Sequence, residues 1–218
     1  STLAHDMRGP LTAIINRAEL LRIITDDSKQ NEMVEKEVHA IEQSVRRVNS
    51  MIQELLEFVS GREVVLEQSV TVIKDLLEPV AVESQMALQH SGIEWSFLMQ
   101  GGENKLLVDR HRFARIIENI INNARDALLS SNTPGPKVSL NASTDAEHLI
   151  LRISDNGPGI PKDMANSLFQ PYTTAGKAQG HGLGLAIVRN LVTANGGSVC
   201  LDSTAENGCT FIIKLPLL

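Results

Sequence analysis

An unbroken heptad pattern of apolar residues runs through residues 34–59. Its members recur at alternating spacings of four and three: Val34, Val38, Ile41, Val45, Val48, Ile52, Leu55 and Val59. This spacing keeps a single apolar stripe on one side of a helix along its whole length, as in helices that pack side by side. The pattern predicts a long helix that must bury its stripe against other helices.

A matching apolar stripe precedes this one. It consists of Ala4, Met7, Leu11, Ile14, Ala18, Leu21 and Thr25. The polar segment 25–30 between the stripes is rich in helix-capping residues, and helices joined by so short a link run antiparallel. A single hairpin cannot bury its stripe completely, so we expect two copies to pair as a dimeric four-helix bundle. The alternative is a monomeric hairpin packed on the rest of the chain, which the length of the stripe disfavours.

Beyond Gly61 the pattern changes to short β-branched or alternating runs separated by helical stretches. Strands are predicted at 63–67, 93–99, 104–108, 137–143, 148–154, 197–202 and 209–215, and helices at 69–90, 110–130 and 184–195. This order predicts an α/β sandwich, with helices on one face of a mixed sheet. The chain is therefore expected to be an α+β protein with a helical hairpin at 1–60 and a sandwich domain at 61–218. A long connection at 161–182, rich in Gly, Thr, Ala, Gln and Lys, precedes the last predicted helix and predicts a lid or binding loop.

Composition and charge narrow the function classes. The net charge is −6 and no Lys/Arg block is present, which disfavours nucleic acid or a membrane surface as the main partner. There is no run of about eighteen apolar residues and no signal peptide, so we expect a cytoplasmic chain whose upstream part is missing. Any membrane attachment would then come only through that upstream part. Cys200 and Cys209 lack metal-ligand spacing and are expected to be packed, reduced thiols.

The predicted helix 110–130 carries a polar row beside its apolar face. Arg115, Asn119, Asn123 and Asp126 lie at i, i+4, i+8 and i+11, so they share one side of the helix. Amide oxygens are hard, neutral ligands that suit a Mg²⁺ ion holding nucleotide phosphates. For this helix taken alone, an ordinary solvated face is the alternative.

A predicted buried strand at 149–154 runs directly into Asp155-Asn156-Gly157-Pro158-Gly159-Ile160. This order places a carboxylate at a pocket floor, and the glycines let the backbone turn sharply and approach a flat ligand. A carboxylate there can accept a hydrogen bond from the exocyclic amino group of adenine. Taken alone, the same residues make only a good turn.

Glycines at 180, 182 and 184 open the last predicted helix, whose free N–H groups form a ready phosphate site. No strand precedes them, so they are not a dinucleotide fingerprint, and Lys177 is not followed by the Ser or Thr of a Walker A loop. Just upstream, Phe169 is placed to anchor the lid and Lys177 to reach a terminal phosphate. A solvated lysine is the alternative for Lys177.

The order and spacing of these features resemble the ATP-binding domain shared by bacterial histidine kinases, DNA gyrase, Hsp90 and MutL. Residues 119–123 are similar to the N box, 155–160 to the G1 box, Phe169 to the F box and 180–185 to the G2 box. The resemblance covers nearly all of 63–218 and implies a Bergerat-type sandwich that binds ATP and Mg²⁺, the metal through Asn123 and adenine through Asp155. The cofactor-binding residues expected on this basis are Asn119, Asn123, Asp155, Gly157, Gly159, Ile160, Phe169, Thr174, Lys177, Gly180, Gly182, Leu183 and Gly184.

The N-terminal residues distinguish histidine kinases from the other proteins that share this ATP-binding domain. His5-Asp6-Met7-Arg8-Gly9-Pro10 resembles the H box of the two-component histidine kinases. A neutral imidazole is a competent nucleophile toward phosphorus, and Asp6 can orient the ring and receive the proton. The resemblance implies a homodimeric autokinase that phosphorylates His5 and passes the phosphoryl group to an aspartate of a response regulator. By themselves, His5 and Asp6 would more often be a surface pair.

Two positions depart from the family pattern. Many kinases of this resemblance carry Thr or Asn four residues after the histidine, to orient water for dephosphorylation of the regulator; Gly9 stands there, so phosphatase activity is expected to be weak. Asp126 stands where many relatives have a basic residue, which leaves Arg115, Lys177 and His181 as candidates to neutralise phosphate. The rival functions are a non-histidine ATPase or Ser/Thr kinase of the same superfamily, and a nucleotide-binding scaffold without turnover.

Overall fold

The computed structural model describes residues 11–18, 21, 34, 38, 40–41, 45, 48, 52, 67–161, 164–165, 167–173, 182–202 and 208–218. The chain divides into two compact units, Ser1–Val59 and Ser60–Leu218. No helix in the described part of the chain is long and apolar enough to cross a membrane.

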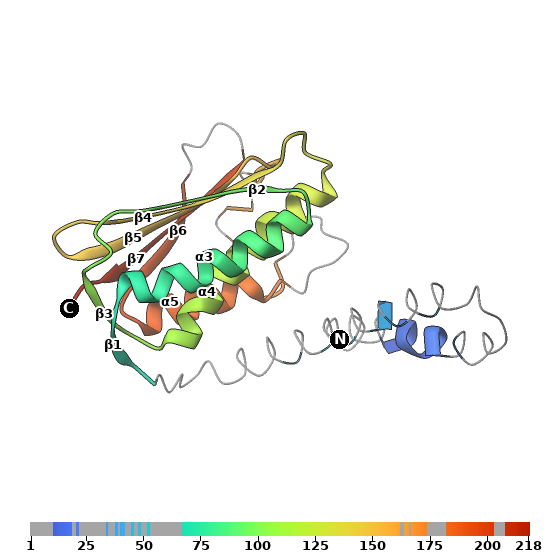
Figure 1. Ribbon diagram of the computed structural model, residues 1–218, viewed down its shortest axis with the longest axis horizontal. Coiled ribbons are helices and arrows are strands. Elements are labelled where there is room, and N and C mark those ends of the chain that lie inside the picture. The colour runs from blue at the N-terminus through green and yellow to red at the C-terminus, as the bar shows by residue number, and fades with distance from the viewer. Residues whose placement is uncertain are drawn as a thin grey trace. The chain divides into compact units, whose positions relative to one another are not determined.

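All described residues of the first unit are helical, which agrees with the prediction of helices there (Figure 1). Six members of the second stripe are among them: Val34, Val38, Ile41, Val45, Val48 and Ile52. None of the six is buried, and Val38 and Val45 are each 42% exposed. The turn predicted at 25–30 and the residues around His5 lie outside the described residues.

A five-stranded mixed sheet forms one layer of the second unit, with strand order β2-β4-β5-β7-β6. β2 pairs with β4 in parallel, and the remaining pairs are antiparallel. The strands are β2 Glu94–Met99, β4 Lys137–Thr144, β5 His148–Asp155, β6 Ser198–Leu201 and β7 Cys209–Pro216. A second, two-stranded antiparallel sheet consists of β1 Ser69–Val72 and β3 Lys105–Val108.

Three helices cover one face of the large sheet (Figure 1): α3 Ile73–His90, α4 Arg110–Ser130 and α5 Gly184–Ala194. This arrangement confirms the predicted sandwich. The core forms because β5 and β7 alternate, which turns residues such as Leu151 and Ile213 inward, and because the apolar face of α4 lies against β5. Phe113 and Ile117 of α4 are completely buried in it.

The predicted start of the first sandwich helix at residue 69 is wrong. Ser69–Val72 forms β1, which pairs with β3 from Ser69↔Val108 to Val72↔Lys105, and α3 begins only at Ile73. The sequence Ser-Val-Thr-Val alternates and is β-branched, so it suits a strand once a partner is available. Of the strand predicted at 63–67, only Glu67 is described, and it lies in no strand.

The prediction of two packed thiols is half right. Cys209 is buried at the start of β7, whereas Cys200 is exposed on β6. The register pairs Val199 with the buried Ile213 and Cys200 with Ile212, so Cys200 lies on the opposite face of the sheet from the core.

Leu128 and Leu129 offer a matched test of how the α4 face supports the sandwich. Leu128 is 1% exposed and Leu129 is 48% exposed on the same helix. We expect Leu128→Ala to lower the free energy of unfolding of the second unit by roughly 2–5 kcal/mol, because it leaves a cavity in the core. Leu129→Ala should cost less than about 1 kcal/mol. Urea denaturation monitored at Trp95 in β2 would measure both, and equal effects would contradict the proposed core.

Candidate functional site

A pocket lies beside α4 near the C-terminal end of β5. Its lining comes from α4, the loop after β5, the described residues around 168–173, the start of α5 and the inner side of β7. Its enclosed volume is about 170 Å³. The lining includes Asn123, Asp155, Gly159, Ile160, Gly182 and Phe211.

The amide groups of α4 lie directly against the first residue of α5. A Cβ atom added to Gly184 would lie 3.3 Å from Oδ1 of Asn119 and 3.7 Å from Nδ2 of Asn123. Both asparagines are half-buried. The missing side chain at 184 thus lets two polar amides approach the N-terminal end of α5, where backbone N–H groups attract anions.

Asp155 is the last residue of β5, so its carboxylate lies at the edge of the sheet and lines the pocket. Its Oδ1 accepts a hydrogen bond from the Gly157 N–H at 2.8 Å. A Cβ at position 157 would lie only 2.8 Å from the same oxygen, so glycine permits the tight turn. Asn156 holds the loop in place, because its side chain accepts from the Lys137 N–H at 2.7 Å and donates to the Gly135 carbonyl at 2.9 Å.

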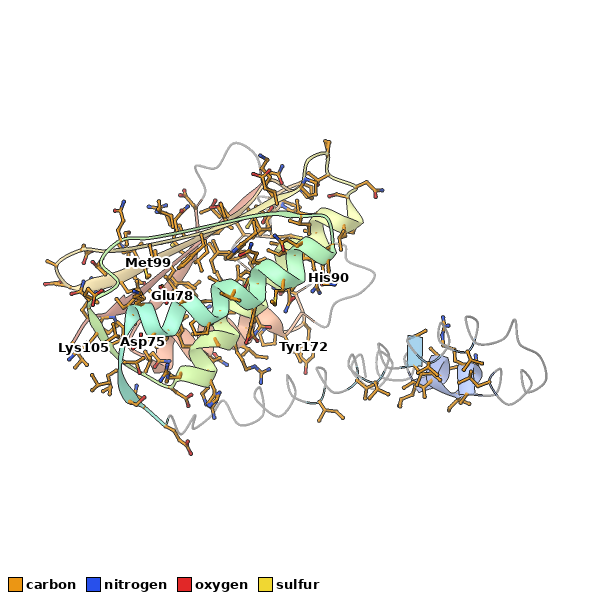
Figure 2. The ribbon with its side chains drawn as sticks, in the orientation of Figure 1. Asp75, Glu78, His90, Met99, Lys105 and Tyr172 are labelled. Carbon is orange, nitrogen blue, oxygen red and sulfur yellow. The ribbon has the colours of Figure 1, made fainter. Side chains whose placement is uncertain are left out.

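Two described residues of the predicted lid, Tyr172 and Gly182, are joined by a backbone hydrogen bond. The Tyr172 N–H donates to the Gly182 carbonyl at 2.8 Å. Gly182 has φ +64°, and a Cβ there would lie 2.5 Å from the backbone carbon of Tyr172. Tyr172 itself is 49% exposed and points away from the sheet (Figure 2). The backbone at Tyr172 and Gly182 therefore approaches so closely that only glycine fits at 182.

Phe169 packs against the sheet at the pocket wall. Its ring meets that of Phe211 edge-on, with centroids 6.2 Å apart and an interplanar angle of 77°. Edge-to-face pairs of this kind are favourable beyond their burial. Phe211 is 5% exposed on β7, so it gives Phe169 a fixed support.

The structure brings together most of the predicted site residues that it describes. Asn123, Asp155, Gly159, Ile160 and Gly182 all line the pocket. Gly157 and Phe169 contact the lining residues Asp155 and Phe211, and Gly184 lies beside Asn119 and the lining residue Asn123. Leu183 is completely buried, so its side chain belongs to the core and only its backbone faces the helix start. His5, Asp6, Thr174, Lys177, Gly180 and His181 lie outside the described residues.

Arg115, one candidate for neutralising phosphate, lies elsewhere. It lines a separate groove between α3 and α4, together with Asp75, Glu83 and Glu118. It is not among the residues that line the pocket. Asp126 forms an ion pair with the neighbouring Arg125 at 3.2 Å, so its carboxylate has a local cation.

Sequence reasoning missed Phe211 as a pocket residue. The alternation of 209–215 was the available signal, since it places Phe211 on the same side of β7 as Cys209. The pairing of Asp155 with Cys209 then brings that side of β7 to the pocket. The position of Phe211 at the pocket therefore depends on the antiparallel register of β5 and β7, which the sequence alone does not give.

Two family models match the chain. Residues 108–218 match the histidine kinase-, DNA gyrase B- and HSP90-like ATPase family, and residues 1–63 match the His Kinase A (phospho-acceptor) domain. The first match spans α4, the pocket and the strands behind it. The second spans the segment with the two apolar stripes.

Curated relatives cover the chain nearly from end to end. It is 28% identical over 218 residues to the sensor protein FixL of Bradyrhizobium diazoefficiens, which covers 99% of this chain and 42% of the relative. It is 28% identical over 217 residues to the sensor histidine kinase ZraS of Salmonella typhimurium, with coverage of 99% and 44%. The chain thus spans less than half the length of either relative.

Solved structures share the fold. The histidine kinase ThkA, in a complex with the response regulator protein TrrA, matches with a TM-score of 0.75 at 23% identity, covering 100% of this chain and 60% of ThkA. The catalytic domain of ThkA alone matches with a TM-score of 0.60 at 24% identity, covering 69% of this chain and 95% of that domain.

Proposed function

Because this chain belongs to the histidine kinase-, DNA gyrase B- and HSP90-like ATPase family and is the catalytic core of a two-component histidine kinase, we propose that it transfers the γ-phosphoryl group of ATP to its own His5. The single observation that carries this proposal is the pocket in which Asn123, Asp155 and Gly182 meet. The match of residues 1–63 to a phospho-acceptor domain supplies the acceptor.

We propose that ATP lies across this pocket from Asp155 to the start of α5. The Asp155 carboxylate would accept the adenine amino group, while the phosphates would lie at the N–H groups that open α5. The residues Asn119, Asn123, Gly157, Gly159, Ile160, Phe169, Gly182, Leu183 and Gly184 would surround the nucleotide, with Thr174, Lys177 and Gly180 added by the lid. The amide oxygen of Asn123 suits a Mg²⁺ ion, which when bound would neutralise phosphate charge.

The transfer step needs little covalent chemistry from the protein. A ring nitrogen of His5 would form a bond to the γ-phosphorus as the bond from that phosphorus to the β,γ-bridging oxygen breaks, releasing ADP. Asp6 would receive the imidazole proton. Positioning and charge neutralisation supply most of the rate in such transfers.

We propose that the phosphoryl group then passes from His5 to an aspartate carboxylate of a response regulator. The complex of the similar kinase ThkA with the response regulator protein TrrA supports this class of partner. Gly9 has no side chain to orient water, so weak phosphatase activity toward that regulator stays a prediction.

We further propose that residues 1–60 form the dimerisation and phosphotransfer hairpin, and 61–218 the ATP-binding domain. The exposed second stripe supports a dimer, because Val38, Val45 and Ile52 remain between 38% and 42% exposed in one chain. Burying such side chains in a second copy removes apolar surface from water at roughly 25 cal/mol per Å².

The test of this function is chemical. Incubation with γ-labelled ATP should place on the chain a label that acid removes and base does not, as expected of a phosphoramidate. An acid-stable label would instead indicate a Ser/Thr kinase. Nucleotide binding without any label would indicate a scaffold, and steady ADP release without label would indicate an ATPase.

Gly182→Ala should weaken ATP binding, because the new Cβ would collide with the backbone of Tyr172 and the residue would be held at φ +64°. We expect a loss of about tenfold or more in affinity, measured by titration with a fluorescent ATP analogue. Gly92→Ala is the matched control: Gly92 has φ +69°, but nothing lies within 4 Å of its added Cβ. Equal losses in the two variants would show that backbone strain, not the lid contact, matters.

A further inference from the structure

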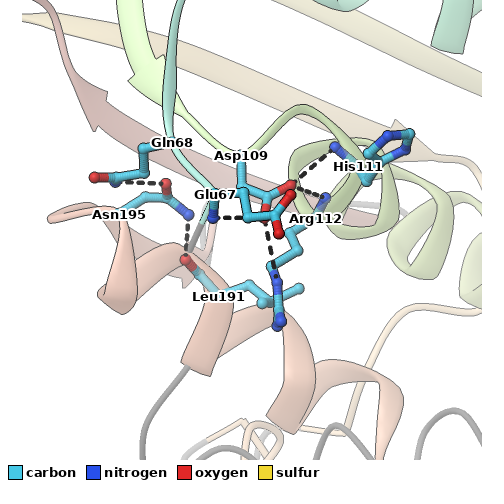
Figure 3. A network of polar contacts seen from close by, with 7 residues as sticks. All are labelled: Glu67, Gln68, Asp109, His111, Arg112, Leu191 and Asn195. Atoms are coloured by element: carbon cyan, nitrogen blue, oxygen red, sulfur yellow. Dashed lines mark hydrogen bonds and ion pairs between the residues drawn. The ribbon is translucent and has the colours of Figure 1, made fainter. Parts of the chain in front are cut away.

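A buried carboxylate at the start of α4 holds two different parts of the chain (Figure 3). Asp109 is 6% exposed. Its Oδ1 accepts the N–H groups of His111 at 3.1 Å and Arg112 at 3.2 Å, which caps α4. Its Oδ2 accepts the Glu67 N–H at 3.2 Å and lies 3.4 Å from Nε of Arg112. Capping and holding Glu67 therefore use separate oxygens.

The next residue is tied to the end of α5. Nε2 of Gln68 donates to Oδ1 of Asn195 at 3.4 Å and to the Leu107 carbonyl at 3.5 Å. Asn195 is 7% exposed, and its Nδ2 donates to the Leu191 carbonyl at 2.8 Å, in the last turn of α5. Two consecutive residues are thus fastened to two helices.

These are the two helices that form the nucleotide pocket. α4 carries Asn123 about 20 Å further along its axis, at 1.5 Å per residue from Asp109. α5 begins at Gly184, against the amides of α4. Glu67 is the first described residue of the second unit, whose sequence follows directly on the unit that contains His5. Glu67 and Gln68 are therefore held at the ends of α4 and α5 that lie away from Asn123 and Gly184.

We propose that Asp109 and Asn195 are positioning residues that clamp residues 67–68, and that this clamp sets how the ATP-binding unit presents the γ-phosphate to His5. The inference rests on the proposed kinase function. A loose join leaves the two reacting groups with more relative orientations, and misplacement by about 1 Å can cost up to a hundredfold in rate. Helix capping alone does not require the bond to Glu67, because Oδ1 already accepts both helix N–H groups.

Two variants break the clamp without touching Asp109 or Asn195. Glu67→Pro removes the N–H that Asp109 accepts, and Glu67→Ala is its control because it keeps that N–H. Gln68→Ala removes the side-chain link to Asn195, and Gln100→Ala, at another exposed glutamine, is its control. Each would be made in the full chain, with thermal unfolding as a check on the fold.

We expect the rate constant for acid-labile labelling at saturating ATP to fall about three- to tenfold in Glu67→Pro and Gln68→Ala. The Kd for ATP should stay within about twofold, and both controls should behave as the unmodified chain. Unchanged labelling in both variants would overturn the clamp. A loss of ATP affinity that matches the loss of labelling would also overturn it, because residues 67–68 would then only hold α4 and α5 in place. If Glu67→Pro does not fold, Gln68→Ala decides. An unmodified chain that takes no acid-labile label refutes the kinase function itself, and the clamp with it.

Discussion

Replacing His5 with Ala should abolish acid-labile labelling from γ-labelled ATP, with a loss of at least about a thousandfold against the unmodified chain. The alanine side chain has no lone pair that can attack phosphorus. A neighbouring side chain would not lie where the imidazole nitrogen lies, so it could not replace His5 as the nucleophile. The second unit, with its pocket, is unchanged by this substitution. Binding of an ATP analogue should therefore stay within about twofold.

The matched control is His90→Ala. His90 is an exposed histidine at the end of α3, where its ring Nδ1 lies 3.1 Å from the Met86 carbonyl, so it tests whether any surface imidazole accepts the label. Labelling of the His90 variant should equal that of the unmodified chain. Label retained in the His5 variant would assign the phosphoryl group to another residue and refute the proposed acceptor.

Elements with a strong local pattern were predicted well. The bounds of α4, Arg110–Ser130, equal the predicted 110–130, because its apolar face repeats regularly along that stretch. The β1 strand was missed for the opposite reason. Ser69–Val72 has only four residues, and its strand character depends on β3, more than thirty positions further along the chain.

The pocket itself was predictable only as a set. Asn123 and Asp155 are each ambiguous alone, and nothing local shows that a helix face and a strand end will meet. Their order resembled a known ATP-binding domain, which placed them together. Phe211 was not predicted to line the pocket, because its position there follows from the β5–β7 register rather than from a motif.

The clamp lies beyond sequence reasoning for a related reason. Asp109 before a helix signals a cap, and that role is present. The partner of its second oxygen is a backbone N–H 42 residues away, and Gln68 meets Asn195 across 127 residues. Backbone donors carry no residue identity, so such a contact leaves no trace in composition or spacing.

Asn123→Ala should remove the response of ATP binding to Mg²⁺ as well as most of the binding. If the Asn123 amide oxygen holds the metal, its loss should weaken Mg²⁺–ATP binding by about a hundredfold, which corresponds to roughly 2.7 kcal/mol. In the unmodified chain, chelating Mg²⁺ should cost a similar factor, whereas in the variant it should cost little. The substitution and the removal of Mg²⁺ would then abolish the same interaction, so their effects on the binding free energy should not add. The difference between the summed and the combined effect measures the coupling between Asn123 and Mg²⁺.

Asn122→Ala is the control for this experiment. Asn122 precedes Asn123 on the same helix, but it is exposed and does not line the pocket. It should bind and respond to Mg²⁺ as the unmodified chain does. A full Mg²⁺ response in the Asn123 variant would contradict the metal assignment even if affinity fell. Labelling of His5 should be lost in Asn123→Ala although its acceptor is intact, whereas His5→Ala keeps nucleotide binding and loses the acceptor. These opposite patterns separate the site that holds ATP from the residue that receives its phosphoryl group.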